Sequence, residues 1–377
     1  MKYRKGAEMS EAVTGDKETS LGRMALRGAA LLAAAFLLHG CGGSSAPAGG
    51  SESGADAGPP TVDAKGCTVY GAPPRPLATL SPDGTLNDAL TLLANACSLY
   101  GGETLSDYTD ANGSTRYACL ITASGASASS PRPMLVYLHP TLLGEDSIIA
   151  TSLTGLINSA NLSGDPARPG FNLLMPLGRN IDQFLPFPLN TGIGWDHWYR
   201  NLDRSSPYLN VDVASIDHYI AEAKGRGIVD SKRVYVTGWS EGADFGSLYG
   251  LNTPGIAATG VYSTDSPYDD AGADPCPAPA SAMNPARPYL DIVRKCDIGG
   301  ACQAAQIFLG QLRNGVMAPS LVHGVILDSN TQEVQLCDAS CGPGSINGTV
   351  IGQQQHTTWP AAWNGNLLDF MEQNPEP

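Results

Sequence analysis

A serine lies between two glycines in the segment Gly238-Trp239-Ser240-Glu241-Gly242. An apolar run leads directly into this pentapeptide, and a helix-like segment follows it. Strand, tight turn and helix in this order is the context in which a G-x-S-x-G serine acts as a nucleophile. The turn holds the serine in a strained backbone conformation and lifts its hydroxyl out of the sheet. Ser240 is therefore the predicted nucleophile, and an inert serine in a glycine-rich turn is the alternative.

A serine hydroxyl needs a base to take its proton, and only His323 and His356 follow Ser240 in the chain. His356 comes after an apolar run and before the last predicted helix, where a loop histidine would reach the edge of the sheet. His323 precedes an apolar run and is typical of a residue that starts a strand. His356 is the predicted base, whereas His139, upstream of the serine, is predicted to be structural.

The carboxylate that orients the base is expected after a strand that lies between Ser240 and His356 in the chain. Asp297 and Asp265 each follow such a predicted strand. The later strand is the usual place for this acid, so Asp297 is preferred and Asp265 stays open. Without a catalytic role, Asp297 would act as the N-cap of the helix that follows it.

Two backbone N–H groups are needed to stabilise the oxyanion of an acyl-transfer reaction. One is expected from Glu241, the residue after the nucleophile. The other is expected from the loop after an earlier strand, where Pro140 has no N–H to offer. Thr141, or Leu142 beside it, is the predicted second donor.

Aromatic side chains are concentrated in residues 194–201, which read GWDHWYRN. Trp195 and Trp198 in this segment, together with Trp239 and Trp359 beside the predicted serine and histidine, are predicted to line a substrate pocket. Packing in the protein core is the alternative for these side chains.

Short apolar runs alternate along the chain with segments of helical apolar spacing. Strands are predicted over residues 116–122, 134–138, 171–175, 233–237, 256–262 and 289–293. Helices are predicted over residues 87–100, 147–158, 211–224, 304–312 and 361–371, and from 242 onward. This alternation predicts the α/β class, with a mostly parallel central sheet and helices on both of its faces.

Residues 130–377 resemble the extracellular poly(3-hydroxybutyrate) depolymerase and feruloyl esterase group of α/β-hydrolases. The resemblance rests on Leu138-His139-Pro140, on the run from Arg233 to Gly242, and on His356-Thr-Thr-Trp-Pro before a helix. It implies an α/β-hydrolase fold, hydrolysis of esters through an acyl-enzyme, and no metal or organic cofactor.

The chain departs from the family pattern at three places. Pro140 replaces the glycine of the oxyanion loop, Glu241 replaces a small or neutral residue, and Asp297 lacks the His-Gly that precedes the family's acid. No polymer-binding domain is expected after the hydrolase segment, so a polymeric and a small ester both remain open as substrates. A peptidase or amidase on the same triad, or a non-catalytic surface-anchored binding protein, are the alternatives.

The first 41 residues are predicted to be a signal peptide with a lipobox. Arg23 and Arg27 precede an apolar run, residues 29–38, that is too short to span a bilayer. The run leads into Leu-His-Gly-Cys41, and lipidation of Cys41 would attach the protein to a membrane of the cell envelope. An ordinary cleaved signal, with a secreted product and Cys41 incidental, is the alternative.

Residues 42–66 consist largely of Gly, Ser, Ala, Pro and Asp and predict a flexible tether. Residues 67–377 are the predicted catalytic domain, and a monomer is expected. The formal charge of −14 argues against nucleic acid as a partner.

The chain has nine cysteines, and eight remain when Cys41 is set aside. Export into an oxidising compartment predicts up to four disulfides among them. Short spacing favours the pairs Cys296–Cys302 and Cys337–Cys341 and leaves the pairing of the other cysteines open. No metal site is expected, because the cysteines lack the two-plus-two spacing of zinc sites.

Overall fold

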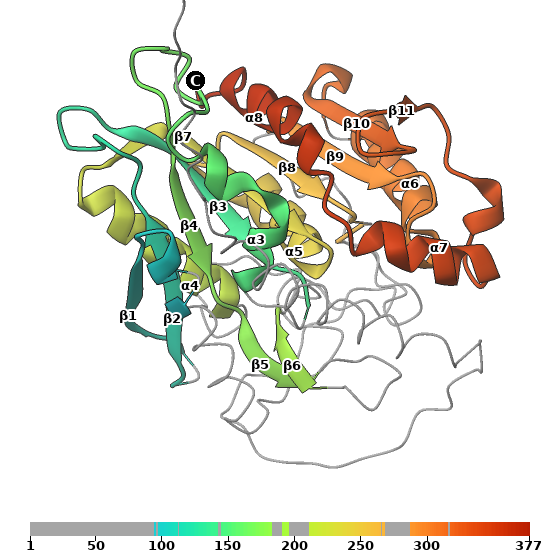
Figure 1. Ribbon diagram of the computed structural model, residues 1–377, viewed down its shortest axis with the longest axis horizontal. Helices are drawn as coiled ribbons and strands as arrows, with labels where there is room; N and C mark the ends of the chain where they lie inside the picture. The colour runs from blue at the N-terminus through green and yellow to red at the C-terminus, as the bar shows by residue number, and fades with distance from the viewer. Residues whose placement is uncertain are drawn as a thin grey trace, which may run out of the picture. The chain divides into compact units, whose positions relative to one another are not determined.

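A nine-stranded sheet forms the centre of the described part of the protein (Figure 1). The computed structural model describes residues 94–95, 97–111, 113–141, 145–182, 191–195, 211–264, 266–267, 287–315 and 317–377. All of them belong to one compact unit, residues 40–377. Several predictions concern positions outside the described residues: the signal peptide with Cys41, the tether, Cys67, Leu142, Trp198, Asp265 and Cys276.

The sheet has the strand order β1-β2-β4-β3-β7-β8-β9-β10-β11. Its parallel strands are β3 (Arg132–Leu138), β4 (Asn172–Pro176), β7 (Val229–Trp239), β8 (Ala258–Tyr262), β9 (Tyr289–Arg294) and β10 (Val322–Leu327). Antiparallel strands close its two edges: β1 (Glu103–Thr109) and β2 (Thr115–Ile121) at one, β11 (Glu333–Val334) at the other. A separate hairpin pairs β5 (Arg179–Asp182) with β6 (Thr191–Gly194).

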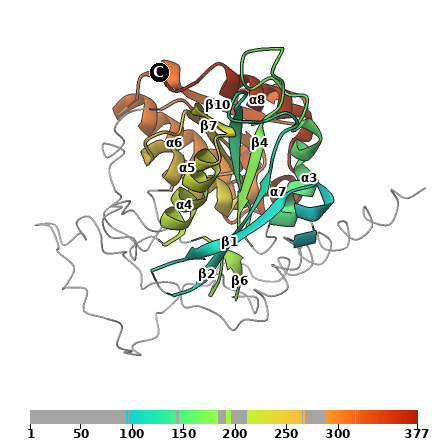
Figure 2. The ribbon, with the colours of Figure 1, turned by 90° about the vertical axis from the view of Figure 1, so that its left-hand side faces the viewer.

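Helices cover both faces of the sheet, as Figure 2 shows in an edge-on view. The α-helices are α3 (Ile148–Thr151), α4 (Val211–Gly225), α5 (Glu241–Asn252), α6 (Ala301–Gly315), α7 (Ile346–His356) and α8 (Asn364–Glu372). The short 3-10 helices are η2 (Glu145–Ser147), η3 (Leu153–Leu156), η5 (Ile298–Gly300), η6 (Pro319–Leu321), η7 (Ala339–Cys341) and η8 (Ala361–Trp363).

Strand β3 separates two buried apolar clusters because its side chains alternate between the faces of the sheet. Val136 and Leu138 pack with residues of α4, α5 and α6. Leu135 and Tyr137 pack with residues of α3 and α8 on the other face. All seven residues of β3 are buried, which is typical of a parallel strand covered on both sides. The predicted α/β class and covered parallel sheet are confirmed.

Two predicted helices are shorter than expected, and four strands were not expected. The predicted helix 147–158 breaks after Thr151 because Ser152 adopts a left-handed conformation with φ 61°. The Thr151 hydroxyl donates to the Ile148 carbonyl at 2.7 Å and accepts from Leu153 N–H at 3.1 Å, which satisfies the backbone at the break. The predicted helix 361–371 begins as η8 and becomes α8. Strands β1, β5, β6 and β11 lie outside the elements expected from sequence.

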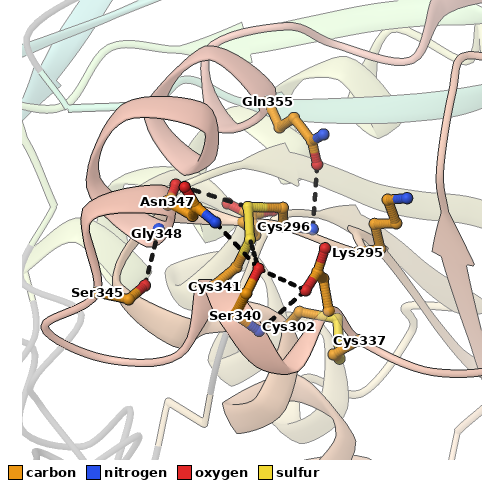
Figure 3. The surroundings of a disulfide bond; sticks show 12 residues. Lys295, Cys296, Cys302, Cys337, Ser340, Cys341, Ser345, Asn347, Gly348 and Gln355 are labelled. Atoms are coloured by element: carbon orange, nitrogen blue, oxygen red, sulfur yellow. Dashed lines mark hydrogen bonds between the residues drawn. A yellow bond between two sulfur atoms is a disulfide. The ribbon is translucent and has the colours of Figure 1, made fainter.

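Three disulfides join cysteines within the described residues: Cys97–Cys119, Cys296–Cys341 and Cys302–Cys337. The predicted pairs Cys296–Cys302 and Cys337–Cys341 are therefore wrong. A disulfide requires Cα atoms about 4.4–6.8 Å apart with Cβ atoms that face each other. The turn η7 packs against the β9–α6 junction and brings Cα pairs to 5.2 and 5.8 Å across the two segments (Figure 3).

Three disulfides are typical of a protein that folds in an oxidising, extracytoplasmic compartment. No helix within the described ranges is both long and apolar enough to cross a membrane.

Candidate active site

Ser240 lies between the end of β7 and the start of α5, in the strained conformation φ 56°, ψ −127°. Its own N–H donates to the Tyr262 carbonyl at 3.1 Å, across the neighbouring strand β8. Its carbonyl accepts from the N–H groups of Ala243 and Asp244, at 2.7 and 3.0 Å. Hydrogen bonds on both sides therefore hold a backbone conformation that a serine rarely adopts.

The two glycines beside Ser240 allow backbone segments to approach each other closely. A Cβ atom at Gly242 would overlap the carbonyl oxygens of Leu138 and His139 at the end of β3. A Cβ atom at Gly238 would overlap the carbonyl of Gly242 in the same way. These contacts explain why both positions of the turn are glycine.

Gly242→Ala is expected to lower the free energy of unfolding by about 3 kcal/mol, because the methyl group meets backbone atoms that cannot rotate away. Gly310→Ala in α6 is the matched control, since a Cβ atom there meets nothing and alanine favours helix by about 1 kcal/mol. Urea unfolding of both variants measures the difference. Equal midpoints for the two variants would contradict the close approach at Gly242.

The structure brings together Ser240, His356 and Asp297 from three separate segments. Ser240 Oγ lies 2.7 Å from His356 Nε2, and His356 Nδ1 lies 2.8 Å from Asp297 Oδ1. A carboxylate accepts only, so Nδ1 carries the proton and Nε2 faces the serine hydroxyl as an acceptor. The Asp297 side chain is fully buried, whereas that of His356 is 17% exposed. The arrangement can pull a proton from the hydroxyl of Ser240 toward His356.

His356 is the last residue of α7 and does not lie on a loop, which corrects the prediction from sequence. Its carbonyl accepts from Trp239 Nε1 at 2.8 Å, directly beside the nucleophile. The Tyr262 hydroxyl shares its single proton between the carbonyls of Gln355 and Thr358, which lie 2.6 and 2.9 Å away. These bonds anchor the end of α7 to β7 and β8 and so set the position of the imidazole.

Asp297 follows β9 and is also the N-cap of η5. Its Oδ1 accepts from Ile298 N–H at 2.8 Å, in addition to the contact with His356. Asp297 therefore contacts His356 and also caps a helical turn, and the capped turn is η5, which precedes the longer helix α6. The alternative acid, Asp265, lies outside the described residues.

Ser263 also touches this group and was not predicted from sequence. It follows β8, is 3% exposed and has a left-handed conformation with φ 65°. Its Oγ lies 2.7 Å from Asp297 Oδ2 and 2.6 Å from His356 Nδ1. A serine at the end of a strand carries no sequence signal for such a contact.

The two predicted oxyanion residues lie next to each other. The Thr141 hydroxyl donates to Glu241 Oε2 at 2.6 Å, which joins the loop after β3 to the first turn of α5. Glu241 is 5% exposed, so its carboxylate is shielded from solvent and accepts this hydrogen bond from another part of the protein. The first N–H groups of a helix carry partial positive charge and favour a developing anion nearby.

His139 is fully buried beside the same loop. Its Nε2 accepts from Gly178 N–H at 2.9 Å, so Nδ1 carries the proton and donates to the Pro140 carbonyl at 2.9 Å. The carbonyl of His139 accepts from Trp195 Nε1 at 2.9 Å. His139 therefore holds the loop that precedes Thr141, and burial lowers its pKa to about 4.

His139 is expected to make stability depend on pH. Its pKa is about 6.5 when exposed and about 4 in the folded protein, so below pH 6.5 the unfolded chain binds a proton that the folded one excludes. The contribution is complete above pH 6.5 and falls by about 3 kcal/mol as the pH drops to 4. Urea unfolding at pH 7, 5.5 and 4 measures it, with His139→Gln as the control for other titrating groups. Parallel pH profiles for the two proteins would contradict this role.

The predicted substrate-lining tryptophans are buried, which corrects that prediction for the ones described. Trp195 is 0% exposed and stacks on Phe245 with ring centroids 5.2 Å apart. Trp239 and Trp359 are 3% and 4% exposed and pack against each other and against Tyr262. Trp195 thus packs on α5, whereas Trp239 and Trp359 pack at the ends of β7 and β8.

No protein-family model matches the sequence, and no curated protein matches it. The chain is similar in structure to a thermostable esterase, at 13% identity over 73% of this chain and 63% of that chain, with a TM-score of 0.47. It is similar to esterase Est22 at 15% identity over 77% and 89% of the two chains, with a TM-score of 0.42. It is also similar to the acylaminoacyl peptidase of Pyrococcus horikoshii at 11% identity over 73% and 42%, with a TM-score of 0.41.

The chain spans less than two thirds of the length of the thermostable esterase. The classification of the fold rests on the topology of the chain itself: a mostly parallel sheet in the order given above, helices on both faces, and a strained serine between β7 and α5. The protein has the α/β-hydrolase fold.

Proposed function

We propose that the protein is a serine hydrolase that cleaves carboxylic esters through an acyl-enzyme. The observation that carries the proposal is the hydrogen-bonded series of Ser240 Oγ, His356 and Asp297, with distances of 2.7 and 2.8 Å. The strained conformation of the serine supports it, because strain of this kind is typical of functional sites.

In the proposed reaction, Ser240 Oγ attacks the ester carbonyl while His356 Nε2 takes the hydroxyl proton. Asp297 keeps the proton on Nδ1 and stabilises the imidazolium that forms. The backbone N–H groups of Glu241 and Thr141 are the proposed donors to the oxyanion of the tetrahedral intermediate. His356 then returns the proton to the leaving alcohol, and a water activated by His356 releases the acid.

An ester is proposed over an amide because the chain resembles the poly(3-hydroxybutyrate) depolymerase and feruloyl esterase group at the serine and histidine motifs. A polyester or a hydroxycinnamate ester is the proposed substrate class. A peptidase with the same triad is the competing function, and the two differ in how they treat matched ester and amide substrates.

Export and attachment to the cell envelope through lipidated Cys41 are part of the same proposal. The three disulfides support export, because such bonds persist in oxidising compartments. Incorporation of radiolabelled palmitate, compared with Cys41→Ala, separates lipidation from simple cleavage of a signal peptide.

An active-site phosphonate tests the proposed function directly. The purified exported protein is expected to take one label on Ser240, found by mass spectrometry of the peptide that contains it. It is also expected to hydrolyse a nitrophenyl ester faster than the matched anilide. A protein that takes no label and turns over neither substrate would be a binding protein with a hydrolase fold.

A further inference from the structure

The hydroxyl of Ser263 fills the space between two members of the proposed triad. Its Oγ is 2.7 Å from Asp297 Oδ2 and 2.6 Å from His356 Nδ1. Because a carboxylate can only accept, the Ser263 hydroxyl donates its single proton to Oδ2. Its oxygen lone pairs then face the proton on His356 Nδ1.

The proton on Nδ1 is therefore held between two acceptors, Asp297 Oδ1 at 2.8 Å and Ser263 Oγ at 2.6 Å. Two acceptors on different segments limit rotation of the ring more than one acceptor does. Rotation of this ring would move Nε2 away from Ser240, which lies 2.7 Å from it. By limiting this rotation, the second acceptor keeps Nε2, the atom that takes the proton, close to Ser240.

The carboxylate of Asp297 is fixed by the same hydroxyl. Oδ1 accepts from Ile298 N–H at 2.8 Å and faces His356. Oδ2 is contacted by Ser263 at 2.7 Å, whereas the N–H of Arg294 lies 3.4 Å away. Ser263 is the shorter of these two contacts to Oδ2 and so contributes most to the orientation of the carboxylate at that oxygen.

The backbone of Ser263 is strained in order to place this hydroxyl. Its φ of 65° is in the left-handed region, and such a residue persists where the surroundings compensate for its cost. Its N–H donates to the Ile292 carbonyl at 2.8 Å in β9, the strand that leads to Asp297. Glycine would adopt this backbone without strain, yet the chain has a serine here.

We propose that Ser263 is a positioning residue of the proposed hydrolase, which holds the carboxylate of Asp297 and the imidazole of His356 in the orientation that directs Nε2 at Ser240. The inference rests on the proposed function. It adds a fourth side chain to the proposed triad. It also predicts that a different acceptor side chain at position 263 would reach His356.

Ser263→Gly tests the hydroxyl without adding strain, because glycine accepts the left-handed backbone. The expected result is a 10- to 100-fold lower kcat, about the value of one hydrogen bond to a charged group, with KM within about twofold of wild type. Ser263→Ala is expected to lose kcat equally and to melt at a lower temperature than Ser263→Gly. A wild-type kcat in both variants would overturn the proposal, because a purely structural residue affects only the melting temperature.

Restoring the activity of an Asp297 variant by a second substitution at position 263 is a result that a purely structural role of Ser263 would not produce. In an Asp297→Ala background, Ser263→Asp is expected to raise kcat at least about tenfold, because its carboxylate can accept from Nδ1 of His356. Ser263→Asn is the matched control: asparagine tolerates the same backbone and has a similar shape, but it carries no charge. Equal kcat in the aspartate and asparagine variants would overturn the inference.

A measurement without substrate separates this inference from the proposed function. The proton on Nδ1 of His356 gives a downfield NMR signal in histidine-labelled protein, identified by its loss in His356→Ala. The signal is expected to move upfield in Ser263→Gly, and an unchanged signal would overturn the contact. If the wild type takes no phosphonate label, the hydrolase proposal fails while this signal still decides the role of Ser263.

Discussion

Ser240→Ala is expected to lower kcat on a short-chain nitrophenyl ester by at least about three orders of magnitude. The hydroxyl 2.7 Å from His356 Nε2 is the proposed nucleophile, and its removal takes away the atom that would form the proposed acyl-enzyme. His356→Ala is expected to lose as much, because the serine then keeps its proton. Asp297→Asn is expected to lose about three to four orders, since an amide favours the wrong tautomer of the histidine.

Two control variants separate these effects from general damage. His323 is an exposed histidine whose ring contacts the Ser320 carbonyl at 3.1 Å, so His323→Ala is expected to stay within twofold of wild type. Asp328 pairs with Lys295 at 2.6 Å on the surface, so Asp328→Asn is expected to do the same. Steady-state kinetics with folding checked by circular dichroism measures all five variants. Residual activity above one per cent in Ser240→Ala would contradict the proposed nucleophile.

Removal of the Cys296–Cys341 disulfide by serine at both positions is expected to lower both stability and kcat. The bond closes a chain separation of 45 residues, for which the loop-entropy model gives about 4 kcal/mol. Cys296 precedes Asp297, and its N–H donates to Gln355 Oε1 at 3.1 Å, next to His356. A roughly tenfold loss of kcat is therefore expected, because Asp297 and His356 lose their fixed separation.

The Cys302–Cys337 disulfide offers a matched control in the same region (Figure 3). It closes a separation of 35 residues, so its removal by double serine substitution is expected to cost a similar 4 kcal/mol or so. Neither cysteine adjoins a triad residue, and kcat is expected to stay within twofold of wild type. Urea unfolding and steady-state kinetics on both double variants make the comparison. Equal kcat in the two would show that the Cys296–Cys341 bond stabilises the fold without supporting the site.

The strained turn at Ser240 and the fold class were predictable from sequence because their signals are local. A strand that turns this tightly into a helix leaves no room for a Cβ atom at positions 238 and 242, and both glycines lie two residues from Ser240. The alternation of apolar runs with segments of helical apolar spacing is a local signal too, because the sequence of each element shows which of its own side chains are buried. His356 was preferred to His323, the other histidine after the serine, for its place before the last predicted helix, and the structure places it 2.7 Å from Ser240 Oγ.

The remaining features depend on contacts between segments far apart in the chain. Ser263 and His356 are separated by 93 residues, and only the pairing of β8 beside β9 brings that hydroxyl to the imidazole. The disulfides follow the packing of η7 on the β9–α6 junction, where short spacing in sequence favoured other pairs. Trp195 is buried because a distant residue, Phe245 of α5, covers its ring. Local sequence reveals the periodicity of each strand and helix, whereas the partner of each side chain is decided by the tertiary fold.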